Sequence, residues 1–131
     1  MADHNFDVVI LGGGSGGYAA ALRSAQLGKS VALIEKDKLG GTCLHRGCIP
    51  TKALLRTSEV YHYITHADAY GLSVEKPAFD LKKVTDRSRK VAAQLNSGVK
   101  SLMKKNKIEV IEGQGRLTGA TTVSVTTANG E

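Results

Sequence analysis

The sequence predicts an α/β fold built on a parallel sheet, and three features of its amino-terminal part support this. Val8–Leu11 and Val31–Ile34 are short, continuous apolar runs, typical of strands that are buried on both faces. Residues 15–27, which are rich in alanine and end before Gly28, predict a helix between them. A strand, a helix and a second strand within about 30 residues form a unit that joins parallel strands.

The middle of the chain is expected to hold an irregular segment and then two helices. Residues 36–50 are predicted to be irregular because they contain several glycines and a proline. A helix is expected from Thr51, with Pro50 in its first turn, where the missing N–H would have no intrahelical partner. Its apolar residues should share one face: Ala53, Leu54, Val60, Tyr61 and Ile64. Residues 67–78 are predicted to form a loop.

The second helix is predicted to begin after Asp80, whose side chain suits an N-cap. Phe79 and Val84 are placed to form a hydrophobic staple across this cap. Apolar residues recur along one stripe of the helix: Leu81, Val84, Val91, Leu95, Val99 and Leu102. Basic residues lie mostly off that stripe: Lys82, Lys83, Arg87 and Lys90.

The last part of the chain is predicted to form strands. Ile108–Ile111 is expected to be the third strand of the sheet. Residues 116–117 and 122–126 should start a hairpin or meander, because apolar and polar residues alternate in the second of these segments. The sequence ends on the turn signal Asn129-Gly130. A turn with no strand after it leads us to expect that the natural chain continues.

Composition argues against several classes of protein. The 131 residues carry a net charge of +6, and nine of the 18 basic residues lie between Lys82 and Lys107, which brings a nucleic-acid partner into consideration. That stretch has no aromatic residues to stack on bases, so a solvated helix face is the better interpretation. There is no run of about 18 apolar residues and no signal-peptide pattern, so we expect a cytoplasmic protein with neither a membrane nor a nucleic-acid partner.

The glycine-rich segment after the first strand fits a phosphate-binding loop. Gly12, Gly14 and Gly17 form a G-x-G-x-x-G pattern between the predicted strand and helix. Gly12 permits a tight turn, Gly14 lets a pyrophosphate approach the backbone, and Gly17 lets the helix pack close to the strand. The helix N-terminus then attracts the phosphates. Glu35, at the end of the second strand, is placed to accept hydrogen bonds from a ribose. The pattern predicts a dinucleotide, either NAD or FAD.

Cys43 and Cys48 are candidates for a redox pair. Residues five apart on a regular helix differ by about 140° and do not face each other. A disulfide between them therefore needs a distorted turn, which Gly47 allows. Its loop is too short to add much stability, so its value would be chemical, and thiols at a helix N-terminus favour the reactive thiolate. Two buried free cysteines remain the alternative. The spacing does not fit a zinc half-site, and no metal site is expected.

Residues 39–55, LGGTCLHRGCIPTKALL, closely resemble the active-site segment of the pyridine nucleotide–disulfide oxidoreductases. The glycine pattern, Glu35 and the later residues 113–115 fall in the order found in that family, so the resemblance covers essentially the whole chain. Among family members, Leu44 and residues 49–52 are most similar to the dihydrolipoyl dehydrogenases. The dipeptide at 45–46, His-Arg, departs from the commoner Asn-Val.

The resemblance implies a role for each matched residue. Cys43 would be the thiol that exchanges with the sulfur of the substrate. Cys48 would lie against a flavin and exchange electrons with it, and Lys52 would lie near the reactive nitrogen of the flavin. The other expected cofactor-binding residues are Gly12, Gly14, Gly17, Glu35, Lys36, Gly40, Gly41, Thr42 and Gly115.

The resemblance also implies a whole-protein function. Residues 1–131 would be the truncated amino-terminal portion of a Rossmann-like FAD-binding domain, without the NAD-binding and interface domains. The expected reaction is oxidation of dihydrolipoamide to lipoamide through a Cys43–Cys48 disulfide, with FAD bound and NAD as acceptor.

Expected partners are the lipoyl domains of 2-oxoacid dehydrogenase complexes and, at full length, a second copy in a homodimer. The chain alone is expected to be inactive. The alternatives are another family member, similar to mercuric or glutathione reductase, or a non-enzymatic nucleotide-binding module.

Overall fold

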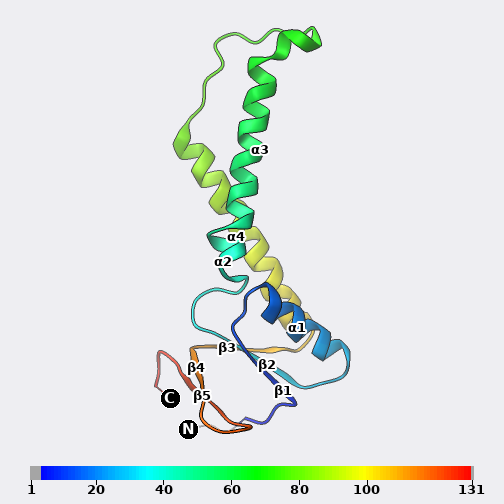
Figure 1. The fold of residues 1–131 in the computed structure, drawn as a ribbon, viewed down its shortest axis with the longest axis vertical. Helices are drawn as coiled ribbons and strands as arrows, with labels where there is room; N and C mark the ends of the chain where they lie inside the picture. Colours follow the sequence, from blue (N-terminus) through cyan, green and yellow to red (C-terminus); the bar gives the residue numbers. More distant parts are fainter. Residues whose placement is uncertain (1–3, 131) are drawn as a thin grey trace.

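The structure, a computed structural model, describes residues 4–130 and contains the predicted strand–helix–strand unit (Figure 1). Its elements are β1 (Val8–Leu11), α1 (Ser15–Gln26) and β2 (Val31–Glu35). β1 and β2 are parallel, and β3 (Glu109–Glu112) pairs in parallel with the other edge of β2, which gives the order β1-β2-β3. The third strand begins one residue later than the sequence predicts. The expected α/β fold with a parallel sheet is confirmed.

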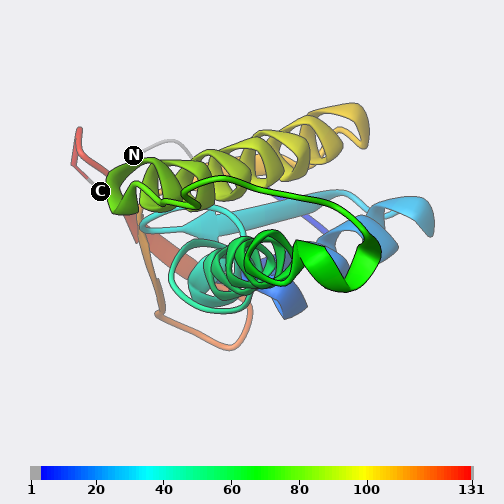
Figure 2. The same ribbon diagram turned by 90° about the horizontal axis from the view of Figure 1, so that it is seen from above.

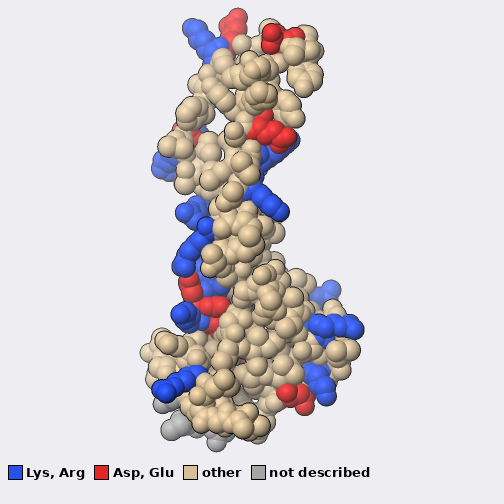
Figure 3. Space-filling model, in the orientation of Figure 1, with Lys and Arg blue, Asp and Glu red and all other residues tan. Residues whose placement is uncertain are grey.

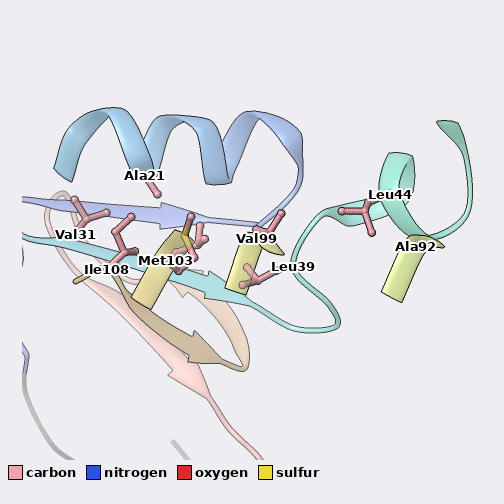
Figure 4. Packing of buried hydrophobic residues seen from close by; sticks show 9 residues of the cluster. Ala21, Val31, Leu39, Leu44, Ala92, Val99, Met103 and Ile108 are labelled. Atoms are coloured by element: carbon pink, nitrogen blue, oxygen red, sulfur yellow. The ribbon is translucent and has the colours of Figure 1, made fainter. Parts of the chain in front are cut away.

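The core lies between the sheet and two helices, α1 and α4 (Leu81–Lys105). Figure 4 shows Ala21 of α1 and Met103 of α4 close to Val31 of β2 and Ile108 before β3. Ala21 and Leu33 are fully buried, and Met103 is 1% exposed. Burial contributes about 25 cal/mol of stability for each Å² of apolar surface removed from water, so this cluster holds the helices on the sheet.

An antiparallel hairpin, β4 (Gln114–Leu117) and β5 (Val123–Thr126), lies against the face of the sheet opposite the two helices. The predicted hairpin is therefore confirmed. All four of the apolar residues in β2 are buried, as expected. In β1, however, the expectation of two buried faces is wrong, because Val9 and Leu11 are 40% and 43% exposed. Among the described strands β1 pairs only with β2, so it lies at the edge of the sheet.

The segment between β2 and the first long helix is more regular than the sequence predicts. Residues 41–45 form a short helix, α2 (Gly41–His45), and the long helix α3 (Cys48–Thr65) begins at Cys48 rather than at Thr51. Gly40, with φ of +103°, turns the chain into α2, and the burial of Leu44 holds α2 in place. Pro50 lies in the first turn of α3, as expected. A 3-10 helix, η1 (Ala67–Tyr70), interrupts the predicted loop.

α3 and α4 form a helical hairpin that extends away from the sheet (Figure 1). Figure 2 looks down α3 and shows α4 inclined to it. Asp80 is the N-cap of α4, because its carboxylate accepts a hydrogen bond from the backbone N–H of Lys83. Phe79 contacts the ring of Tyr61 edge-on and is 69% exposed, so its predicted role as a staple with Val84 stays a prediction.

The two apolar faces predicted for this hairpin are only partly buried. In α3, Ala53 is buried, but Leu54, Val60 and Ile64 are 42%, 40% and 38% exposed. In α4 the buried residues are Ser88, Ala92, Val99 and Met103, whereas Leu81, Leu95 and Leu102 of the predicted stripe are exposed. Leu54, Val60, Ile64 and Leu81 are exposed because the far part of the hairpin stands clear of the sheet, whereas Leu95 and Leu102 face an open pocket beside α1.

Charged side chains lie along the margins of the hairpin, and the face between them is largely uncharged (Figure 3). The side chains of Lys82 and Lys83 are 84% and 86% exposed, as expected for a solvated helix face. Within residues 4–130 no helix is both long and apolar enough to cross a membrane.

Candidate functional site

The phosphate loop, residues 12–17, leads from the end of β1 into α1. Gly12 has a φ of +95°, which favours glycine, and its N–H donates to the carbonyl of Ile34 at 2.8 Å. A Cβ added to Gly12 or Gly14 would meet no atom within 4 Å. Gly14 is the N-cap of α1, and no side chain caps this end of the helix. The loop therefore offers open backbone and a helix N-terminus to an anion.

Gly17 lies where α1 passes closest to β1. A Cβ at this position would be 1.8 Å from the carbonyl oxygen of Gly12 and 3.6 Å from Ile10. Any side chain here would push the helix away from the strand. The structure thus provides the close helix–strand packing that the glycine pattern predicts at this position.

Glu35 ends β2 and is bonded to the phosphate loop. One carboxylate oxygen accepts the N–H of Gly13 at 2.7 Å, and the other accepts the N–H of Asp37 at 2.9 Å. Each carboxylate oxygen has a second lone pair, so the group can still accept hydrogen bonds from a ribose. Glu35 is partly buried beside the loop, whereas Lys36, the next predicted cofactor residue, is exposed.

The redox turn, residues 39–48, packs directly on the phosphate loop. The N–H of Gly40 donates to the carbonyl of Gly13 at 2.7 Å. A Cβ on Gly41 would be 2.9 Å from the Cα of Gly14, so the two backbones are in contact there. Thr42 follows and is exposed. The fold thus brings together two sets of predicted cofactor residues that are separated by more than twenty positions in the sequence.

Cys43 and Cys48 form a disulfide with a Cα–Cα distance of 4.7 Å. Cys43 lies in α2, and Cys48 is the first residue of α3. Gly47 separates the two helices with φ of −130° and ψ of −108°, outside the helical region. A Cβ on Gly47 would be 3.3 Å from the carbonyl of Thr42, which is a tight contact. A regular helix would point the two thiols in different directions. The break at Gly47 is the distorted turn that the sequence analysis requires for a disulfide at this spacing.

The two cysteines have different surroundings. Cys43 lines an open pocket of about 540 Å³ between α1, the redox turn and α4, with apolar walls from Ile49, Leu95 and Leu102. Lys105 contributes a charged group to this pocket. Cys48 is exposed. Lys52, also exposed, follows Cys48 by four residues, so both lie on one side of α3.

Gly115 is the last predicted cofactor residue, and the structure places it in β4 against the ends of β1 and β2. A Cβ here would be 2.6 Å from the side chain of Leu11 and 3.1 Å from that of Ile34. These two residues immediately precede Gly12 and Glu35 in the sequence. Gly115 therefore lies close to the strand ends from which the phosphate loop and the predicted ribose acceptor start.

Three residues that the sequence analysis did not select also support the redox turn. Asn96 of α4 donates to the carbonyl of Leu39 at 2.6 Å, and so does the ring of His45 at 2.8 Å. Arg89 of α4 donates to the carbonyl of His45 at 3.2 Å. Of these three, Asn96 is the residue that the sequence could have indicated, because it is a polar residue between Ala92 and Val99 on the buried side of an amphipathic helix.

Comparison with known proteins places this arrangement in a family. Residues 6–131 match the family described as pyridine nucleotide-disulphide oxidoreductase. The chain belongs to this family. The dihydrolipoyl dehydrogenase of Zymomonas mobilis is 60% identical over 131 residues, all of this chain and 28% of that protein. That of Bacillus subtilis is 51% identical over 133 residues, 96% of this chain and 28% of that protein.

A solved structure has a similar fold. LpdA from Mycobacterium tuberculosis superposes with a TM-score of 0.86 at 26% identity, over 95% of this chain and 28% of its own. The chain therefore spans little more than a quarter of the length of these relatives. The expected Rossmann-like fold of this family is confirmed for the described residues.

Proposed function

We propose that this chain is the amino-terminal portion of the FAD-binding domain of a disulfide oxidoreductase that oxidises dihydrolipoamide to lipoamide with NAD as acceptor. The observation that carries the proposal is the Cys43–Cys48 disulfide: Cys43 lines a pocket, and the turn that holds the disulfide packs on a phosphate loop. The similarity to two dihydrolipoyl dehydrogenases over nearly the whole chain supports the choice of substrate.

The residues present fit FAD. The open backbone at Gly12 and Gly14 and the uncapped N-terminus of α1 suit a pyrophosphate. Glu35 would accept from the ribose, and Lys52 would lie beside the flavin ring next to Cys48. The other contacts would come from Gly17, Lys36, Gly40, Gly41, Thr42 and Gly115. Bound FAD would supply the two-electron chemistry that links the cysteine pair to NAD.

The chain's own part in the reaction is thiol–disulfide exchange. A substrate thiolate attacks the sulfur of Cys43, the Cys43–Cys48 bond breaks, and Cys48 leaves as a thiolate. The second substrate thiol, after losing its proton, attacks the substrate sulfur of this mixed disulfide, which forms the cyclic disulfide product and releases Cys43. The substrate is oxidised by two electrons and the cysteine pair is reduced by two. The N-terminus of α3 favours the thiolate at Cys48 as leaving group.

The pocket supports the assignment of Cys43 to the substrate, which the family resemblance implies. Its walls are mainly apolar, which suits a hydrocarbon arm that ends in a dithiolane. Cys43 is the cysteine that lines it, whereas Cys48 lies on the side of α3 that it shares with Lys52. The same disulfide would therefore be approached by the substrate at one sulfur and by the flavin at the other.

The whole-protein expectations remain part of this proposal. At full length we expect a homodimer in the cytoplasm. Its expected partners are the lipoyl domains of 2-oxoacid dehydrogenase complexes. NAD would be bound by a domain outside residues 1–131. The 131-residue chain alone should not turn over dihydrolipoamide, which an assay of NADH formation would check.

An absorbance spectrum of the full-length protein tests the assignment. Adding dihydrolipoamide should produce a long-wavelength charge-transfer band as the Cys48 thiolate meets the flavin. Cys43→Ser should show such a band without substrate, because Cys48 then has no disulfide partner, and Cys48→Ser should never show it. A colourless protein, or a flavin whose spectrum ignores thiols, would contradict the proposal. Parallel assays with glutathione disulfide and mercuric ion separate dihydrolipoamide from the substrates of related enzymes.

A further inference from the structure

Two donors on α4 hold the backbone of the redox turn on either side of Cys43. Asn96 donates to the carbonyl of Leu39, four residues before Cys43, at 2.6 Å. Arg89 donates to the carbonyl of His45, two residues after Cys43, at 3.2 Å. These bonds join residues that are 57 and 44 positions apart in the sequence. They fix the turn to a separate element of the fold rather than to its own neighbours.

A third bond closes the turn on itself. The Nε2 of His45 lies 2.8 Å from the carbonyl oxygen of Leu39, and because a carbonyl can only accept, this hydrogen bond requires the ring proton on Nε2. The oxygen of Leu39 has two lone pairs, so it accepts from both His45 and Asn96. Leu39 is only 3% exposed, so a carbonyl without a hydrogen-bond partner would lower the stability of the folded protein there. Both donors therefore stabilise the turn.

The donors stand on a rigid support. Arg89 and Asn96 are seven residues apart, about two turns, so they project from the same side of α4. Between and beyond them on that side are Ala92 and Val99, which are buried in the core at 4% and 9% exposure. Figure 4 shows Ala92 close to Leu44 of α2. The side of α4 that carries the donors is thus anchored in the core.

From this geometry we propose that α4 is a splint for the redox turn, with Arg89, Asn96 and His45 as positioning residues. This inference rests on the proposed function, in which the disulfide opens in each cycle. When the bond is open, the splint keeps the carbonyls of Leu39 and His45 in place and so keeps Cys43 within reach of Cys48. Holding the two thiols together favours re-forming the disulfide, because less chain entropy is lost on closure.

The test is an exchange equilibrium that is read from the cysteine thiols themselves, with parent and variants compared under the same flavin content. The full-length protein is incubated with mixtures of reduced and oxidised dithiothreitol, and free thiols are alkylated and counted by mass spectrometry. In this reaction the Cys43–Cys48 bond breaks, the cyclic disulfide of dithiothreitol forms, and two hydrogens pass to the protein thiols. The variants are Arg89→Leu, Asn96→Leu and their combination.

The splint predicts a shift of the equilibrium toward the protein dithiol by about two- to fivefold in the combined variant. This corresponds to a change in reduction potential of about 9–21 mV, since tenfold is 29.6 mV for a two-electron couple. The free energy of this shift is smaller than that of two whole hydrogen bonds, because the oxidised form of the variant loses these bonds as well. His45→Leu should shift the equilibrium in the same direction, whereas His45→Gln, which keeps an N–H near the position of Nε2, should restore it.

Asn106→Leu is the matched control, because Asn106 lies just after α4 and its side chain donates to Leu102 within the same helix, away from the redox turn. It should leave the equilibrium unchanged even if it lowers the melting temperature. An unchanged equilibrium in the combined variant, or an equal shift in Asn106→Leu, overturns the splint. Arg89 is exposed, so Arg89→Leu keeps the test valid if Asn96→Leu fails to fold. The flavin spectrum tests the proposed function separately, because it is read from the absorbance of the flavin, whereas this equilibrium is read from the counted thiols.

Discussion

A methyl group at Gly17 should separate α1 from β1. In Gly17→Ala the new Cβ would start 1.8 Å from the carbonyl oxygen of Gly12, whereas ordinary contacts begin at 3.4 Å. The helix or the loop must therefore move by about 1.6 Å, and the atom in the way is backbone, which cannot rotate aside as a side chain can. Overpacking of this kind typically costs about 1–3 kcal/mol of unfolding free energy.

The neighbouring glycine provides the control. Gly16 lies in the same helical turn, and a Cβ there would meet nothing within 4 Å. Gly16→Ala should therefore leave stability unchanged or raise it by up to about 1 kcal/mol, because alanine favours the helix. Urea unfolding followed by circular dichroism would compare the two variants with the parent. The comparison requires that the slope of the unfolding free energy against urea concentration is the same for all three proteins. If Gly17→Ala matches Gly16→Ala within about 0.5 kcal/mol of unfolding free energy, α1 does not pack closely on β1 at this position.

Two further predictions concern capping and pH. Asp80→Ala should lower the unfolding free energy by about 1 kcal/mol through loss of the α4 N-cap, whereas Asp86→Ala, which removes an exposed ion pair, should cost less than about 0.5 kcal/mol; equal effects in urea unfolding would argue against the cap. The backbone N–H of Ser30, followed by its hydroxyl, lowers the pKa of Asp7. A lowered folded pKa gives stability that is complete above the unfolded value of roughly 3.9 and is lost as the pH falls through the folded value. Asp7→Asn should thus shift the urea midpoint more at pH 7 than at pH 3, and an equal shift at both would refute this.

The parts of the fold that follow local rules were predictable from the sequence. The buried run 31–34, the G-x-G-x-x-G turn and the N-cap at Asp80 each depend on residues within a few positions of one another, and the structure has all three. The pairing of Cys43 with Cys48 was left open on spacing alone. The family resemblance, rather than geometry, made it the expected answer.

The errors arise where distant parts of the chain decide the outcome. α2 was predicted to be irregular because of its glycines, yet its helical turn is held by the burial of Leu44 against α4. The buried side of α4 is rotated from the predicted stripe, since Leu95 and Leu102 face the open pocket. Asn96 could be noticed as a polar residue on that side, but its acceptor, Leu39, lies 57 positions away and no spacing rule reaches it.

The parallel pairing of β2 with β3 has a consequence for synthesis on the ribosome. Glu35 pairs with Glu112, so the whole redox turn and the helical hairpin lie in the crossover between two neighbouring strands. At about 5–20 residues per second, this crossover takes roughly 4–15 s to translate. For that time one hydrogen-bonding edge of β2 has no partner from its own chain. An open strand edge is where nascent chains pair wrongly with each other, so crowding of ribosomes at this stage should limit the yield of folded protein.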